Sequence, residues 1–171
     1  MTSLPQPTSQ PVKITFTVEM PTKGSNDRAH KMARHRRVQR ERALVREAWE
    51  EVREELLGSG LVEPGMVLRM PLGVKLKARR LAKKAGLDLR RHEAVLKPRF
   101  PLDVRLTRIS QRKLDPFENL PVALKGVVDE LARQFGVDDR KHDLVRYMPP
   151  QQEKGQKGNP AVRIEIERRE G

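Results

Sequence analysis

The stretch that decides the fold is Leu114–Asp139, which reads LDPFENLPVALKGVVDELARQFGVDD. Six apolar residues recur there at three- and four-residue spacing, the pattern of an amphipathic helix. They are Leu120, Leu124, Val127, Val128, Leu131 and Phe135. Asn119 is a natural N-cap, Pro121 falls in the first turn, and Gly136 follows the last apolar residue. The stretch therefore predicts a helix over Leu120–Phe135.

Three other segments alternate apolar and polar residues, which is the period of a half-buried strand. They are Val12–Val18, Leu102–Arg108 and Val162–Ile166. A second amphipathic helix is predicted over Arg28–Leu57, closed by Gly58 and Gly60. Because two helices supply one apolar cover for three strands, we expect an α+β fold with a small mixed sheet covered by two main helices.

The rest of the chain gives shorter signals. Residues 142–148 could form a further strand, and Pro149–Pro160 is polar and rich in Gly, Gln and Lys, as in a loop. Residues 1–11 have the composition of a disordered lead-in, so we expect one domain over residues 12–171.

Several classes of protein are excluded by composition. The chain has no cysteine, which excludes disulfides, thiolate zinc sites and cysteine nucleophiles. No apolar run approaches the length of a membrane helix, and Met1–Gln10 lacks the features of a signal peptide. We therefore expect a soluble cytoplasmic protein without a membrane partner.

Positive charge is concentrated in the middle of the chain. The formal net charge is +13, and residues 23–113 hold 25 Lys and Arg against 11 Asp and Glu. Such an excess favours a polyanionic partner, most simply nucleic acid, over the alternative of a solvated basic face. The candidate DNA-binding residues are Arg34, Arg36, Arg37, Arg40, Lys77, Arg79, Arg80, Lys83 and Lys84.

Acidic residues flank the helix that decides the fold. Asp115 and Glu118 precede it, and Asp138 and Asp139 follow Gly136. Carboxylates gathered among cations suit Mg²⁺. Acidic residues are, however, equally common at a helix start and in a turn, where they need bind no metal. The two ends of such a helix are about 25 Å apart, so a shared site requires the following loop to fold back. The spacing of these carboxylates alone therefore favours a structural role over a metal site.

The same stretch resembles the signature of the RusA family of Holliday-junction resolvases, which is roughly D-x-D-N-L, a Lys, D-x-L, then Asp-Asp. The N-terminal strand ending at Pro21, followed by Ser25–Asn26, His30 and a basic helix, is similar too, as is the final V-R-I-E-I-E strand. Residues 61–99 have no counterpart in the resemblance.

The resemblance implies an Mg²⁺-dependent endonuclease that resolves four-way junctions or other branched DNA, acts as a homodimer and needs no small-molecule cofactor. Asp115, Glu118 and Asp139 take the positions of the metal ligands, and Lys125 takes that of the catalytic lysine. Two departures concern the ligands: Glu118 replaces an Asp, and the Pro116–Phe117 insertion displaces Asp115 by one residue.

Residues 61–99 allow a second interpretation. Residues 61–73 fit a loop or a short edge strand, Leu76–Ala85 a short basic helix, and Leu89–Leu96 a second helix. Two short helices around Gly86 resemble a helix-turn-helix, which would make the protein a non-catalytic DNA-binding regulator. We prefer a basic helical insertion that supports DNA contact, because few large apolar residues are present to pack a recognition helix.

Overall fold

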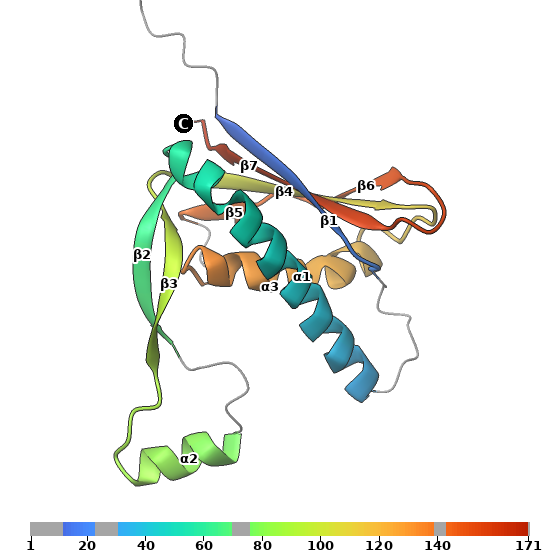
Figure 1. The fold of residues 1–171 in the computed structure, drawn as a ribbon. Helices are drawn as coiled ribbons and strands as arrows, with labels where there is room; N and C mark the ends of the chain where they lie inside the picture. Colours follow the sequence, from blue (N-terminus) through green and yellow to red (C-terminus); the bar gives the residue numbers. More distant parts are fainter. Residues whose placement is uncertain (1–11, 23–30, 70–75, 139–142, 171) are drawn as a thin grey trace, which may run out of the picture.

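A computed structural model describes residues 12–22, 31–69, 76–138 and 143–170 (Figure 1). The elements in chain order are β1 (Lys13–Glu19), α1 (Lys31–Gly58), β2 (Val62–Arg69), α2 (Leu76–Lys84), β3 (Arg91–Pro98), β4 (Leu102–Ser110), α3 (Asn119–Gln134), β5 (Val145–Tyr147), β6 (Gln151–Lys154) and β7 (Ala161–Arg168). The predicted lead-in 1–11, Ser25–Asn26, His30 and Asp139 lie outside the described residues.

The three predicted strands share one mixed sheet, as expected. Its order is β1-β7-β4-β5, with β6 also paired to β4. The pairings of β7 with β1 and β4 are antiparallel, and those of β4 with β5 and β6 are parallel. The predicted strand at 142–148 is present as β5. The interpretation of Pro149–Pro160 as a loop is wrong for Gln151–Lys154, because pairing with β4 makes a strand of polar residues.

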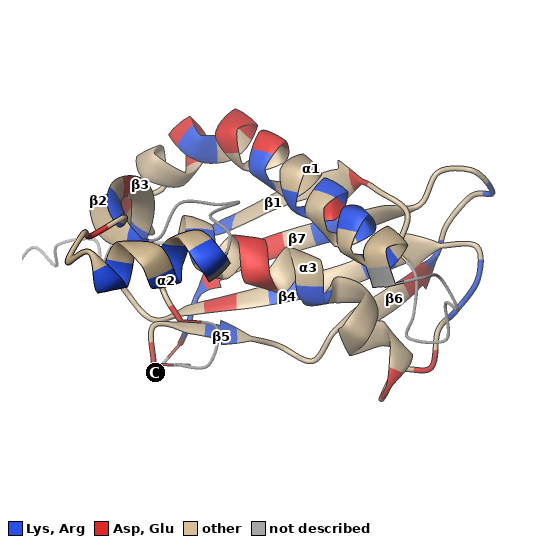
Figure 2. Ribbon diagram, turned by 90° about the horizontal axis from the view of Figure 1, so that it is seen from below, with Lys and Arg blue, Asp and Glu red and all other residues tan. Residues whose placement is uncertain are grey.

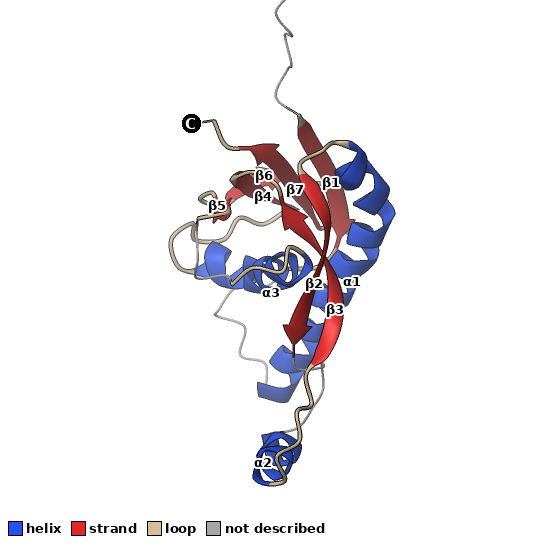
Figure 3. Ribbon diagram, turned by 90° about the vertical axis from the view of Figure 1, so that its left-hand side faces the viewer, coloured by secondary structure: helices blue, strands red, loops and turns tan. Residues whose placement is uncertain are grey.

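Both main helices lie on the same side of this sheet (Figures 1 and 3). Ile14, Phe16 and Val18 of β1 alternate with exposed residues and point into the core. Trp49 of α1 is fully buried, and its ring makes edge contacts with Phe16 and with Phe135, at centroid distances of 6.4 and 5.0 Å. One tryptophan thus joins the sheet to both helices, and the α+β prediction is confirmed.

Residues 61–99, which have no counterpart in the RusA resemblance, contain β2, α2 and β3. We call these three elements the arm. Strands β2 and β3 form a separate antiparallel ribbon, and α2 lies at its far end, away from the main sheet (Figures 1 and 3). The predicted helix over Leu89–Leu96 is wrong, because residues 91–98 pair with β2 along their whole length. With a single helix in the described part of the arm, the helix-turn-helix is not formed.

The middle of the ribbon packs against the end of α3. Gly136 has a φ of 71°, and a Cβ there would lie 2.9 Å from Val95 and 3.1 Å from Val67. Glycine is required both for this left-handed turn and for the close approach of the ribbon. The chain turn that ends α3 therefore also seats the arm.

Candidate functional site

The predicted DNA-binding residues of α1 lie along its first half. Arg34, Arg36 and Arg40 are exposed, whereas Arg37 is half-buried and pairs with Glu41. Figure 2 shows bands of Lys and Arg on α1, α2 and α3, on the side of the molecule that carries the helices. The geometry leaves three of these four arginines open to a polyanion.

The predicted DNA-binding residues of α2 are all exposed: Lys77, Arg79, Arg80, Lys83 and Lys84. The helix sequence LKARRLAKK contains no acidic residue. In the loop that follows, hydrogen bonds from Arg90 lower the pKa of Asp88 to about 2, so its charge pairs with Arg90 instead of reaching α2. The tip of the arm is thus a concentrated and uncompensated positive charge.

Two of the predicted metal ligands lie at the start of α3. Asp115 Oδ1 accepts hydrogen bonds from the backbone N–H groups of Phe117 and Glu118, at 3.0 and 2.8 Å. Asp115 and Glu118 are both exposed. The predicted N-cap Asn119 is instead the first helical residue; Glu118 occupies the cap position, and its side chain makes no capping hydrogen bond. Asp115 therefore accepts hydrogen bonds from backbone N–H groups in the turn that precedes α3. This is the structural role that the spacing of the carboxylates favoured.

Of the other predicted residues, Lys125 lies near the middle of α3. Lys125 Nζ is 2.9 Å from Asp129 Oδ1, one turn further on. Asp138 follows the end of α3, and Asp139 lies outside the described residues. Since α3 spans Asn119–Gln134, about 23 Å separates its ends, and the structure does not bring Asp115 or Glu118 beside Asp138. Within the part of the chain that the structure describes, no group of three His, Asp or Glu side chains is arranged to hold a metal.

A polar pocket of about 310 Å³ lies beside the C-terminal half of α3. It is lined by Arg42, Arg69, Asp129, Arg133 and Asp138, together with Ala132 and Val137. Asp129 is held between two cations, because Arg42 donates to Asp129 Oδ2 at 2.5 Å and Lys125 reaches Oδ1. The pocket therefore presents carboxylates framed by cations that could contact a phosphate.

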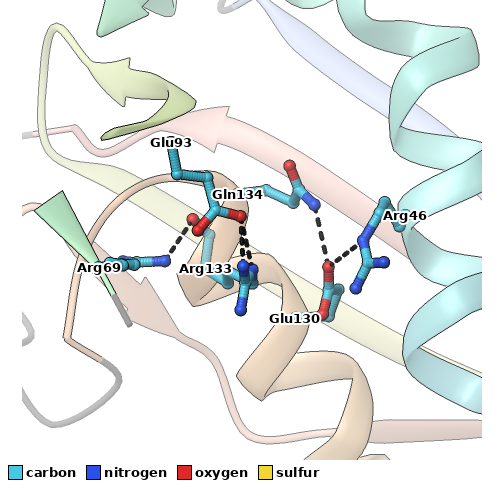
Figure 4. A network of polar contacts seen from close by, with 6 residues as sticks. All are labelled: Arg46, Arg69, Glu93, Glu130, Arg133 and Gln134. Carbon is cyan, nitrogen blue, oxygen red and sulfur yellow. Dashed lines mark hydrogen bonds and ion pairs between the residues drawn. The ribbon is translucent and has the colours of Figure 1, made fainter. Parts of the chain in front are cut away.

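A second layer of polar contacts supports this pocket (Figure 4). Glu130 is 1% exposed and accepts hydrogen bonds from Arg46 and Gln134, each at 3.0 Å. A buried carboxylate without such donors would be strongly destabilising. The bond from Arg46 also fixes α1 against α3.

The arm is tied to the same helix. Arg133 donates to Glu93 Oε1 of β3 at 2.8 and 2.5 Å, and Arg69 of β2 donates to the Arg133 carbonyl at 2.9 Å. Burial lowers the pKa of Arg69, an effect that Glu93 opposes. The arm, the pocket and α3 are thus one connected unit.

Sequence reasoning missed most of this pocket. Arg42, Arg69, Asp129 and Arg133 are not among the residues that the sequence predicted for a site. The available signal was the one-turn spacing of Arg42 and Arg46 on the same helix flank.

Comparisons with known proteins add no relative. No protein-family model matches the chain, and no curated protein matches it. Among the described residues, no helix has both the length and the apolar character needed to cross a membrane.

Proposed function

We propose that the protein binds DNA and that the arm carries the principal contact. The proposal is based on the charge of α2. Five of its nine residues are exposed Lys or Arg, and none is acidic. Like charges one turn apart repel each other, so such a helix is destabilised by its own charge until a polyanion neutralises it. The exposed arginines of α1 and the cations of the polar pocket would extend the contact towards the body of the protein.

Binding is tested by fluorescence anisotropy with labelled linear duplex and a synthetic four-way junction over a range of salt concentrations. We expect affinity to fall steeply as salt rises, since each neutralised phosphate releases counterions. Affinity that is weak and insensitive to salt would contradict the proposal.

We further propose that the bound DNA is branched and is cleaved with Mg²⁺, in an endonuclease that acts as a homodimer in the cytoplasm. The resemblance of Leu114–Asp139 to the RusA family supports this, as does the meeting of Asp129, Asp138 and several cations in one pocket. Their carboxylate oxygens suit Mg²⁺, and Asp139 is adjacent to Asp138 in sequence. Asp115 and Glu118 do not fit a centre at this end of α3. When bound, the ion would supply Lewis-acid stabilisation of phosphodiester charge.

The deciding experiment compares Mg²⁺-dependent cutting of a four-way junction with that of linear duplex of the same sequence. Asp139→Asn should abolish cutting while junction binding persists, and Asp143→Asn, an exposed neighbour, serves as the matched control. Sedimentation at micromolar concentration tests the dimer, which a purely monomeric profile would contradict.

A silent DNA-binding protein is the second candidate. It is favoured by the use of Asp115 as a hydrogen-bond acceptor in the turn that precedes α3, and by the length of α3 between the predicted ligands. Unimpaired binding with no cutting of any branched substrate would select it.

A further inference from the structure

The N-terminal strand β1 lies at one edge of the main sheet. In the strand order β1-β7-β4-β5 it pairs with β7, and in the part of the chain that the structure describes no strand lies along its other edge. Such an edge presents a row of N–H and C=O groups that can pair with another chain. The strand is seven residues long and contains no proline, so this edge is open to a partner strand.

The backbone groups on the open edge belong to the exposed residues of β1. Just beyond the strand, the N–H of Met20 donates to the carbonyl of Pro160, which lies directly opposite, at 2.9 Å. Because hydrogen-bonded and non-bonded pairs alternate along an antiparallel ladder, the even-numbered residues of β1 bond to β7. The N–H and C=O groups of the odd-numbered residues therefore point to the open edge. They are Lys13, Thr15, Thr17 and Glu19.

The sequence of β1 is complementary to itself when it is reversed. In KITFTVE the central residue is Phe16, and each residue before it has a matching residue after it. A threonine matches a threonine, one β-branched aliphatic residue matches another, and a lysine matches a glutamate. The matching pairs are Thr15 with Thr17, Ile14 with Val18, and Lys13 with Glu19. Two copies of β1 in antiparallel register would therefore place opposite charges across from each other at both ends of the ladder.

We infer that β1 pairs with β1 of a second copy of this chain, in antiparallel register about a two-fold axis at Phe16. In this register odd-numbered residues lie opposite odd-numbered residues, so the open N–H and C=O groups of the two copies meet. Each such pair exchanges two hydrogen bonds. A strand edge that matches itself in both charge and hydrogen bonding fits a two-fold dimer better than it fits an unrelated strand.

Two side chains near the ends of β1 support this register. Lys13 contacts Glu165 of β7, yet its side chain is 40% exposed and can also reach Glu19 of the second copy. Val12, which precedes the strand, is an apolar residue that is 42% exposed. In the same register it would lie opposite Met20 of the second copy, so the pairing would remove its side chain from water.

The pairing would also place the helices of both copies on one side of the dimer. Directly opposite residues of a ladder project to the same face, so the two-fold axis is perpendicular to the continuous sheet. Both main helices cover one face of the sheet in each copy (Figures 1 and 3), and the cations of α1 would therefore face the same way in both. The inference rests on the proposed homodimer and deepens it by naming the interface.

The test is sedimentation equilibrium of the full chain without DNA, over a range of micromolar concentrations. The parent should dimerise. Glu19→Lys puts a lysine opposite Lys13 at both ends of the ladder and should weaken dimerisation by about tenfold. Adding Lys13→Glu restores opposite charges and should return the dissociation constant to within about threefold of the parent value. Asp143→Lys, an exposed position beside β5 at the other edge of the sheet, is the matched control and should leave the constant unchanged.

Thr17→Pro is a second variant, because it removes an N–H that points to the open edge and none that bonds to β7. With a circular dichroism spectrum like that of the parent, it should weaken dimerisation by about tenfold or more. Equal dissociation constants for Glu19→Lys and Asp143→Lys, or parent-like dimerisation of folded Thr17→Pro, would overturn the β1 interface and leave the homodimer itself standing. A parent that stays monomeric would remove both the homodimer and the inference, whereas DNA binding is decided separately by anisotropy.

Discussion

Removing the cations on one face of α2 should weaken DNA binding more than removing the same charge elsewhere. Lys77, Arg80 and Lys84 are spaced i, i+3, i+7 and share one face, whereas Arg79 and Lys83 lie about a third of a turn away. If the first face meets the DNA backbone, the triple alanine variant loses three phosphate contacts. Each contact contributes about 0.9 to the slope of log K against log salt, so the slope should fall by about 2.7.

The same arithmetic sets the loss of affinity. At about 0.1 M salt, the loss of three contacts should lower the association constant of the triple alanine variant on the order of 500-fold. Anisotropy with a labelled duplex, titrated at several KCl concentrations, measures slope and affinity together. The matched control is Lys113→Ala with Lys154→Ala and Lys157→Ala, which removes the same charge from exposed sites at the β6 end of the sheet, away from α2 (Figure 1).

The control variant should keep most of the parent slope, because those lysines lie far from the arm. If the slope of log K against log salt falls equally in both triple variants, DNA binding depends on the total charge of the protein, and α2 is not the principal contact. If neither loses slope, DNA is held by the body of the protein, and the argument from uncompensated charge on α2 is refuted.

Three further changes test the core, the sheet and the polar pocket. Trp49→Ala should lower the free energy of unfolding by about 4 kcal/mol, measured by circular dichroism, because it empties the contact between both helices and the sheet; a loss below about 1 kcal/mol would contradict this. Burial raises the pKa of Asp103, but hydrogen bonds and charge attraction from Arg146 and Arg169 together outweigh it, so this pKa lies below the ordinary 3.8. Its stabilisation is present above pH 3.8 and is lost as pH falls through the lowered pKa, so Asp103→Asn should lower stability by about 2 kcal/mol at neutral pH and by less in acid; a difference constant with pH in thermal melts would refute it. Lys125→Ala should reduce the rate of junction cutting while changing junction affinity by less than about twofold, and equal losses of rate and affinity would show that Lys125 only binds DNA.

Periodicity predicted the main sheet and both large helices because each carries its apolar residues mainly on one face. It failed at Leu89–Leu96, a short apolar run that fits a helix or a strand, where pairing with β2 decided the outcome. It also missed β6, because Gln151–Lys154 is polar and becomes a strand only through hydrogen bonds to β4. Local sequence cannot encode which partner strand will be adjacent.

The candidate site was less predictable because its contacts join distant segments. The Arg42–Asp129 and Arg46–Glu130 pairs span 87 and 84 residues, and neither half identifies the other by spacing. Yet both pairs flank the apolar stripes that were predicted, since Arg42 and Arg46 border Val45, and Asp129 and Glu130 border Leu131. Two amphipathic helices that cover the same face of one sheet lie side by side. The polar residues that border their apolar stripes must then either pair with each other or be buried without a partner. Because a lone buried charge is strongly destabilising, opposite charges at these flanks are a prediction that follows from the fold class.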